Sequence, residues 1–507
     1  MLRINSLLGR AVCAAVCVSL LATGDRAYAV DKPFVWDDGA STHNWTDADN
    51  WNPSIVGGPR NLDDWECLVT VPGGGNAVIF NAPLPNPPLP LPVQITDFYL
   101  GNNSRLVLEP DTDLTVLRTA DIAGIIDAQG GNFTANGTAA FTGNRARVYA
   151  SGGAKVSIAA EAYSSPGLTN YSPAGGSWDW TLFSASGPTT ELHLSALTVI
   201  DASFHVVNGA FGSNHNRQHI SVEKGALLDL SGLQTVHGPT LLGSLSFSAS
   251  DNGSVLDMSG TQSFSSRGRD NRITLFTSNG GHLKLGGVSS SARMHISMSS
   301  ATDHLEFTKP ITLASNVIVT APDGGLVTLN GDFIFNHTNT SGMRLGLAHI
   351  ECVGDSQRLE VGGTDFGLHW ELLPDDNFGY TQLTVGQNDH TSLVELVDLV
   401  DNHEPGVDDA LYLFGNEDLG MEGLHMLGGS TLDIGDLNVY ALLDLDLDGV
   451  FERTRIRDLF PDDVTVIPFD HNGNDGFIRI VPEPSTLSML VLGALGMLLT
   501  IRRRNRI

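Results

Sequence analysis

A short glycine-bounded unit, Gly-x-x-h-x-h-x-Gly with apolar residues at h, recurs through the middle of the chain and restricts the folds open to it. Its clear copies are residues 225–232, 253–260, 280–287 and 324–331. The central leucines of the first three copies, Leu228, Leu256 and Leu283, are 28 and then 27 residues apart. The chain therefore contains an internal repeat, although an irregular one.

Within each unit apolar and polar residues alternate, as in Leu228 and Leu230 against Asp229 and Ser231. A period of two with one buried face predicts a β-strand, and the flanking glycines predict tight turns. A spacing near 27 residues suits one coil of a right-handed parallel β-helix, in which neighbouring coils bury each other's apolar residues. We therefore expect an all-β, irregular solenoid with end caps. Tandem β-sandwiches are the alternative.

The C-terminal 27 residues, 481–507, have three parts in a fixed order. They are a Pro-Glu-Pro signature (Pro482, Glu483, Pro484), an apolar run at 487–501 and a basic cluster (Arg502, Arg503, Arg504, Arg506). As a helix, the apolar run would measure roughly 22 Å, which is shorter than the ~30 Å hydrocarbon core of a membrane. The arginines would stay on the cytoplasmic side, so the rest of the chain would face outward.

This tail resembles the PEP-CTERM sorting signal of exported bacterial proteins. The resemblance covers about 27 of 507 residues and rests on the order and position of the three parts. It implies a transmembrane helix at 487–501 before processing, cleavage by an exosortase-type enzyme near Pro484, and delivery to the cell surface or an extracellular polysaccharide matrix. A plain C-terminal membrane anchor is the alternative.

The N-terminal residues 1–29 are typical of a secretory signal peptide. Arg3 and Arg10 form the charged start, residues 11–23 are apolar, and Ala27 and Ala29 form an A-x-A cleavage site. Both ends of the chain thus predict export.

Two of the four cysteines lie in the signal peptide, which leaves Cys67 and Cys352. The sequence does not decide whether these two cysteines form a disulfide, and it contains no disulfide framework and no CxxC motif. Without the signal peptide and the tail from Ser485, the body carries 21 basic and 56 acidic residues, a formal charge of −35. Such a charge repels nucleic acid and anionic lipid, which excludes nucleic acid as a partner.

Four of the seven tryptophans lie near the start of the body, at Trp36, Trp45, Trp51 and Trp65. Their spacing resembles the N-terminal segment of bacterial surface proteins with autotransporter-like β-strand repeats. We interpret them as a cap on the open end of a β-stack, because terminal solenoid repeats need one. An exposed platform for sugar rings is the alternative. Residues 83–92 contain six prolines and predict an extended connector.

Residues 411–444 resemble a C-terminal module of exported planctomycete-like proteins, through Gly429 to Asp433 and Leu437, Asn438 and Tyr440. We interpret it as a second cap. The sequence then divides into a signal peptide (1–29), an N-terminal cap and connector (30–98), a β-repeat solenoid (99–403), an acidic C-terminal β module (404–480) and the sorting signal (481–507).

The sharpest candidate for a metal site is Asp444, Asp446 and Asp448, followed by Gly449. Carboxylates at positions 1, 3 and 5 with glycine at 6 open a calcium loop. Position 12 is Arg455 instead of an acid, although Glu452 could substitute in another geometry. Calcium is therefore the one cofactor considered, with a solvated acidic turn as the alternative.

A second pattern, His215 and His219 with Glu223, would align zinc ligands on a helix. Because no amphipathic helix is evident, we expect surface-loop histidines. No sequence signature of a catalytic site is present, and the five lysines of the body do not gather in a lyase-like or hydrolase-like motif.

We therefore expect an exported structural or adhesive protein of the cell surface or extracellular matrix, and not an enzyme. Its expected partners are an exosortase-type processing enzyme, extracellular polysaccharide and, before processing, the membrane. A polysaccharide lyase or hydrolase on a β-helix is one alternative. A calcium-dependent glycan-binding module is the other.

Overall fold

The computed structural model describes residues 30–480, except 55–58, 61–64, 75–76, 81–91, 144, 165–177, 203–215, 240–242, 267–271, 323, 338–341, 347, 371–378, 401–408, 461–463 and 470–474. The predicted signal peptide, the connector up to residue 91 and the tail from 481 lie outside these residues. So do Ala27, Ala29, Pro482, Glu483, Pro484, Arg502, Arg503 and Arg504.

The described residues are almost entirely β-structure, with no α-helix among them. Short 3₁₀ helices interrupt the strands, and those described in full are η1 (Ala48–Asn50), η4 (Glu417–Leu419) and η5 (Ile456–Leu459). No helix in this part of the chain is long and apolar enough to span a membrane.

The largest sheet, sheet A, runs through most of the molecule. Its strands are β1 (Val30–Trp36), β2 (Trp51–Asn52), β3 (Trp65–Val71), β5 (Val93–Leu100), β7 (Asp113–Ile122), β9 (Asn132–Phe141), β11 (Lys155–Ser164), β13 (Glu191–His193), β14 (Val199–Asp201), β16 (Leu227–Asp229), β17 (Thr235–His237), β19 (Val255–Met258), β20 (Ser263–Ser265), β22 (His282–Leu285), β23 (Ser289–Ser290), β25 (His304–Phe307), β28 (Leu326–Leu329), β31 (His349–Cys352), β35 (Gln382–Val385) and β38 (Leu424–Met426).

Sheet B faces it across the core. Its strands are β4 (Ala77–Phe80), β6 (Arg105–Leu108), β8 (Ile125–Gln129), β10 (Arg147–Ser151), β12 (Trp178–Ser186), β15 (Asn216–Glu223), β18 (Gly243–Ser250), β21 (Arg272–Ser278), β24 (Arg293–Met298), β27 (Val317–Thr320) and β30 (Met343–Arg344).

Two smaller sheets complete the C-terminal part of the molecule. Sheet C contains β26 (Ile311–Leu313), β29 (Phe333–Phe335), β32 (Ser356–Glu360), β36 (Leu393–Val397), β39 (Ser430–Gly435), β42 (Val466–Phe469) and β43 (Gly476–Ile480). Sheet D contains β33 (Gly363–Thr364), β34 (Gly379–Tyr380), β37 (Asp409–Leu413), β40 (Asn438–Leu443) and β41 (Glu452–Arg455).

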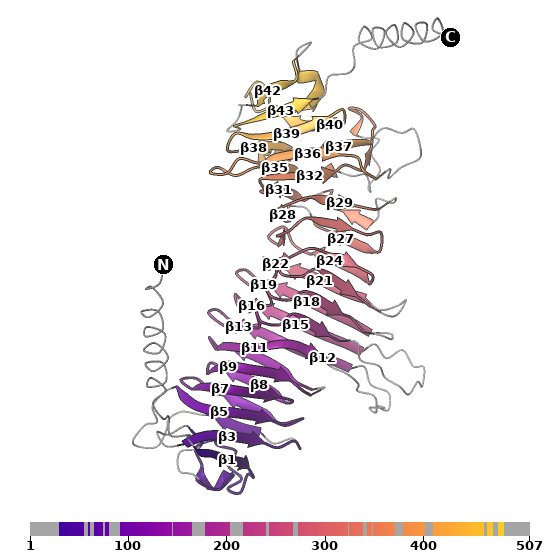
Figure 1. The fold of residues 1–507 in the computed structure, drawn as a ribbon. Helices are drawn as coiled ribbons and strands as arrows, with labels where there is room; N and C mark the ends of the chain where they lie inside the picture. Colours follow the sequence, from indigo (N-terminus) through magenta and orange to yellow (C-terminus); the bar gives the residue numbers. More distant parts are fainter. Residues whose placement is uncertain are drawn as a thin grey trace, which may run out of the picture.

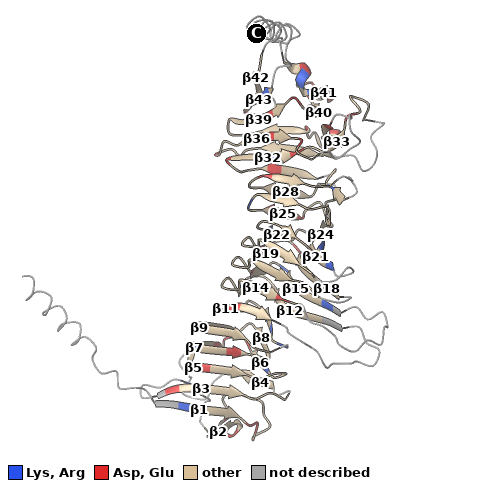
Figure 2. Ribbon diagram, turned by 45° about the vertical axis from the view of Figure 1, so that its right-hand side comes forward, with Lys and Arg blue, Asp and Glu red and all other residues tan. Residues whose placement is uncertain are grey.

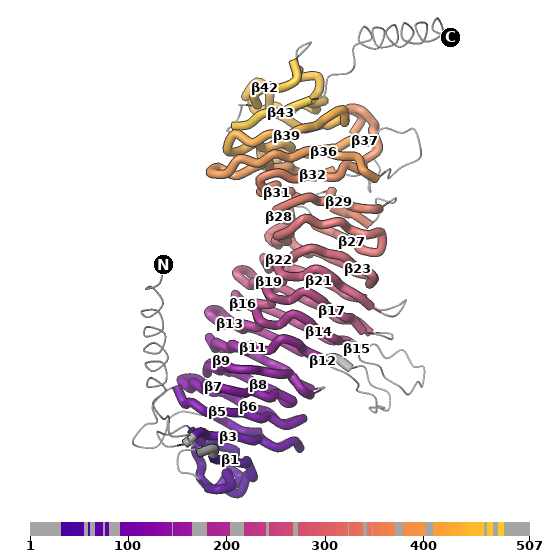
Figure 3. Tube along the Cα trace, viewed as in Figure 1, coloured from indigo at the N-terminus to yellow at the C-terminus, as the bar shows by residue number. Residues whose placement is uncertain are grey.

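Successive turns of the chain stack along one long axis from β1 to β43 (Figures 1 and 3). The pairing within the stack is parallel: Leu228 of β16 lies opposite Leu256 of β19, and Leu256 lies opposite Leu283 of β22. The same inward column continues through Leu305, Val327, Ile350, Leu383 and Leu424. All these side chains are buried. The repeat units therefore stack as a parallel β-solenoid requires, and antiparallel sandwiches do not fit this pairing.

The two glycines that bound a repeat unit are required for different reasons. Gly225 and Gly253 both have φ of 80°, which a side chain rarely tolerates, so they form the turn that enters the strand. At Gly260 an added Cβ would lie 2.1 Å from the carbonyl oxygen of Ser231 on the preceding coil. The second glycine therefore allows two coils to approach closely.

The N-terminal end of the stack is closed by an aromatic cluster. Trp36, Trp45 and Trp51 are each 0–1% exposed. The ring of Trp51 lies edge-on to the other two at 4.9–5.0 Å, and its indole N–H donates to the Trp45 carbonyl at 2.7 Å. Trp45 also packs edge-on against Phe80, and all three buried rings offer no exposed face to a sugar.

Both cysteines of the body are buried thiols that no disulfide joins. Burial raises the pKa of Cys67 and that of Cys352 to about 12, so neither forms a reactive thiolate at neutral pH.

The C-terminal part adds three antiparallel pairs among the described strands, β33 with β37, β40 with β41 and β42 with β43, and the N-terminal end has one, β1 with β2. The predicted boundary between residues 98 and 99 falls inside β5, which pairs in parallel with β3 and β7. The division of the chain into domains stays a prediction.

Candidate metal centre and the sorting motif

The outward face of sheet A carries two neighbouring columns of side chains, most of them polar. One column contains Glu191, Leu227, Val255, His282, His304, Leu326, His349 and Gln382. The other, two residues further along each strand, contains His193, Asp229, Asp257, Lys284, Glu306, Thr328, Glu351, Thr384 and His425. Because the register is parallel, residues from successive coils become direct neighbours.

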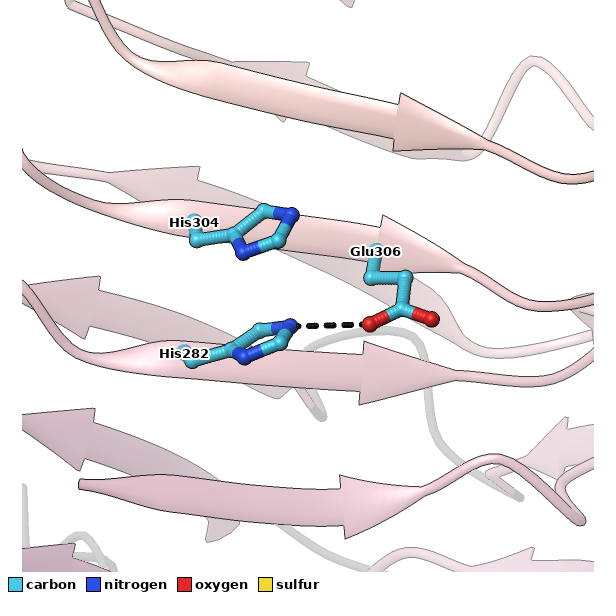
Figure 4. Close-up of side chains that lie close together, drawn as sticks. All are labelled: His282, His304 and Glu306. Atoms are coloured by element: carbon cyan, nitrogen blue, oxygen red, sulfur yellow. Dashed lines mark hydrogen bonds and ion pairs between the residues drawn. The ribbon is translucent and has the colours of Figure 1, made fainter. Parts of the chain in front are cut away.

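Three residues of these columns converge on one point, as Figure 4 shows. His282 lies on β22, and His304 and Glu306 lie on the next strand, β25. The imidazole rings stack with centroids 3.9 Å apart and an interplanar angle of 14°, and His282 Nε2 lies 3.0 Å from Glu306 Oε2. One ligand atom from each residue lies within 4.8 Å of the other two. All three side chains are half-buried.

The local sequence explains why these side chains meet. His282 and His304 each stand directly before an inward leucine, Leu283 or Leu305, and those leucines are register partners. The alternation of the strand then sends both histidines outward, with Glu306 following on the same face of β25.

Two further polar groups border the cluster. The Lys284 ammonium lies 3.4 Å from Glu306 Oε2, and Thr328 Oγ1 lies 2.9 Å from His304 Nε2. The hydrogen bond from His282, with help from Lys284, lowers the pKa of Glu306 to about 2. Burial, with the neighbouring His282, lowers the pKa of His304 to about 4. At neutral pH Glu306 is therefore ionised and His304 is neutral.

Elsewhere in the columns the histidines have other partners. His349 Nε2 lies 2.8 Å from Thr384 Oγ1 and 4.0 Å from Glu351. His193 lies 3.1 Å from Glu191 and 3.2 Å from Asp229.

The predicted calcium loop lies at the C-terminal end, between β40 and β41. A carboxylate oxygen from each of Asp444, Asp446 and Asp448 lies within 4.8 Å of the other two. Asp444 is 7% exposed, and its Oδ1 is buried with no hydrogen-bond partner among the described residues. Glu452 Oε2 lies 3.5 Å from the Leu445 amide, so this carboxylate turns back toward the loop.

The other histidine pattern does not form a site among the described residues. His215 lies outside them, and His219 lies half-buried on strand β15, with Nδ1 2.6 Å from Ser246 Oγ. The expectation of a loop was wrong for His219, because the segment extends a sheet B strand.

Sequence reasoning missed His282, His304 and Glu306. The available signal was the shared pattern His-Leu-x at residues 282–284 and 304–306, placed where the repeat puts an outward residue. The second copy lacks the bounding glycines, which concealed it.

Comparison with known proteins gives one match. Residues 481–504 match the PEP-CTERM protein-sorting motif. No curated protein and no solved structure is significantly similar to the chain. The motif identifies an exported protein that an exosortase-type system sorts to the cell envelope. The resemblances to autotransporter-like repeats and to planctomycete-like proteins stay predictions.

Proposed function

We propose that the protein is a structural and adhesive rod of the cell surface or extracellular matrix. The observation that carries this proposal is the parallel ladder of sheet A, which runs from β1 to β38 as one stack (Figure 1). Such a stack holds its two ends far apart, because each coil adds a fixed rise. The sorting motif follows in sequence after the last coil, so the rod would extend away from the point of sorting.

A row of arginines on sheet B supports an adhesive role toward anionic polysaccharide. Arg217 of β15, Arg272 of β21 and Arg293 of β24 occupy equivalent register positions, with Ser244 of β18 between the first two. All three arginines are exposed. Figure 2 shows basic segments on these strands, although the chain as a whole has a net negative charge. Guanidinium groups bind carboxylates and sulfates through paired hydrogen bonds.

The adhesive part is tested with polygalacturonate as a carboxylated probe and dextran as a neutral one. We expect the full-length protein to bind polygalacturonate, and the change of Arg217, Arg272 and Arg293 to Gln to weaken binding at least about fivefold. A charge-matched control changes Arg118, Arg358 and Arg453, which lie outside the row. An equal loss of polygalacturonate binding in both triple variants would show that only net charge matters, and it would contradict the proposal.

The sorting part is tested by mass spectrometry of C-terminal peptides from membrane, wall and medium fractions. Chains outside the membrane that end near Pro484 would support a processed address signal. Intact tails found only in membranes would indicate a plain anchor instead.

A second candidate function is calcium binding at Asp444, Asp446 and Asp448. The buried, unpartnered Oδ1 of Asp444 favours it, because such an oxygen normally has a hydrogen bond or a cation. We expect Ca²⁺ to raise the melting temperature of the full-length protein and Asp446→Asn to abolish that rise. Asp436→Asn, at an exposed site nearby, is the matched control. A rise that persists in Asp446→Asn would contradict this site.

A further inference from the structure

We infer that His282, His304 and Glu306 form a site for a divalent transition metal of the Zn²⁺ class, which joins two neighbouring coils of the solenoid. This site is separate from the acidic loop at Asp444. It does not depend on the adhesive role proposed above.

The donor set is the first argument. Two imidazoles and one carboxylate are ligands that Zn²⁺ and its neighbours prefer, whereas Ca²⁺ and Mg²⁺ prefer sites made of oxygen. Three protein ligands also leave one position for water or an external ligand, unlike a closed structural site with four.

The distances are the second argument. With metal–ligand bonds of about 2.0–2.1 Å, the ligand atoms of a tetrahedral site are roughly 3.3 Å apart. His282 Nε2 and Glu306 Oε2 are 3.0 Å apart, close to that edge. The stacked rings hold His304 beside them, with all three ligand atoms within 4.8 Å (Figure 4). Because the nitrogen lone pairs lie in the ring planes, the two stacked imidazoles must turn out of their stack about their side-chain torsions before both point at one metal ion.

The position in the stack is the third argument. The inward leucines Leu256 and Leu283 are 27 residues apart, whereas Leu283 and Leu305 are only 22 apart. The coil therefore shortens at the point where β22 meets β25. A metal bound by His282 on one strand and by His304 and Glu306 on the next would fasten this junction.

Lys284 sets how tightly the site binds. Its ammonium lies 3.4 Å from Glu306 Oε2 and is 32% exposed, so it competes with a metal for the carboxylate. The long side chain can turn to solvent when a metal enters. Removing this charge should therefore strengthen metal binding, the opposite of what removing a ligand does.

The test is calorimetric titration of chelator-treated full-length protein with Zn²⁺, followed by Co²⁺ absorption spectroscopy. We expect one Zn²⁺ per chain at this site and the visible bands of tetrahedral Co²⁺. His304→Gln should weaken Zn²⁺ binding at least about hundredfold, because losing a residue that merely supports a ligand already costs about 10- to 100-fold. Lys284→Met should tighten it about two- to fivefold.

The matched control is His349→Gln. His349 lies in the same column and contacts Thr384 as His304 contacts Thr328, yet it is not part of the cluster. It should leave Zn²⁺ binding unchanged. Asp446→Asn separates this site from the acidic loop in the same way.

Zn²⁺ should also raise the melting temperature of the wild type and not that of His304→Gln. Circular dichroism checks that each variant is folded, and a gain of affinity in Lys284→Met cannot come from misfolding. The inference is overturned if the wild type binds no Zn²⁺. It is equally overturned if His304→Gln binds Zn²⁺ as tightly as His349→Gln does.

Discussion

The regular coils from β16 to β29 and the C-terminal region from β32 to β43 bury different kinds of side chain. In the regular coils the buried residues are apolar or carry hydroxyl groups, and Asp303 is the one buried carboxylate among the residues described there. Among its own described residues, the C-terminal region buries five carboxylates: Glu360, Asp409, Glu422, Asp433 and Asp444. The first region is therefore stabilised mainly by apolar stacking. The second depends on how each buried charge is compensated.

Two buried carboxylates, one from each region, differ in how far their oxygens are satisfied. Asp303 accepts from three backbone amides, those of Gly280, Ser299 and Ser300, at 2.8–3.0 Å. Glu360 accepts from the Leu399 and Val400 amides through Oε1, while its Oε2 has no partner among the described residues. A buried carboxylate whose hydrogen bonds are all made should stabilise the fold, whereas one with an unpaired oxygen should lower its stability.

The largest effect should come from the apolar column of the regular coils. Leu256→Ala removes a fully buried side chain between Leu228 and Leu283 and should cost about 2–5 kcal/mol of stability. Urea denaturation followed by circular dichroism measures it. Val255→Ala, on the outward side of the same strand, is the control. Equal losses at the two positions would refute the assigned register.

Asp303→Ala tests the satisfied carboxylate. It leaves three backbone amides without their acceptor and should cost about 2–3 kcal/mol. Asp303→Asn, which keeps one acceptor oxygen, should lie between the wild type and Asp303→Ala in the same denaturation assay. A neutral outcome for Asp303→Ala would remove the contrast between the two regions.

Glu360→Gln should have the opposite sign. Burial raises the pKa of Glu360 to about 7, above the value of 4.5 for an exposed glutamate. The folded state therefore binds more protons than the unfolded state between these values, and stability falls as pH rises from about 4.5 to 7. At pH 8 the full cost of ionisation is present, and Gln removes it while still accepting from both amides.

We expect Glu360→Gln to stabilise the protein by about 1–3 kcal/mol at pH 8 and to have little effect at pH 4. Denaturation at the two pH values measures the difference. Glu395→Gln, exposed in the same region, controls for net charge. Destabilisation at pH 8 would show that ionised Glu360 is compensated after all.

The smallest effect should come from the ion pair of Arg479 and Asp433 in the C-terminal region. Arg479 Nε lies 2.9 Å from Asp433 Oδ2, but the arginine side chain is half exposed. Water screens the exposed guanidinium, and the Gly435 amide still donates to the buried Asp433 carboxylate, so Arg479→Gln should cost about 1 kcal/mol or less. The loss should shrink in high salt, which denaturation at two ionic strengths checks. A salt-independent loss would point to packing instead of charge.

The sequence predicts the regular coils well because their signals are local. The alternation in residues 225–232 and 253–260 defines both the strand and its inward face, and the glycines mark where coils turn or touch. The acidic loop at Asp444 was found for the same reason, since its three carboxylates lie within five residues.

The metal cluster could not be predicted in this way. Whether His282 and His304 become neighbours depends on the length of the coil between them, and that coil is shorter than those before it. The partial compensation of the Glu360 charge is also invisible in the sequence. The two backbone amides that donate to its carboxylate, those of Leu399 and Val400, lie on another coil. Contacts between coils set both features.

Because the coils stack in register, the number of coils sets the length of the solenoid. Each coil between β16 and β22 contacts mainly the coil before it and the coil after it. Duplicating or deleting one whole coil would thus change the reach by one increment of about 4.8 Å, with both ends and the export address left as they are. The tryptophan-filled end and the sorting motif would then stay unchanged while evolution lengthens or shortens the solenoid between them by whole coils.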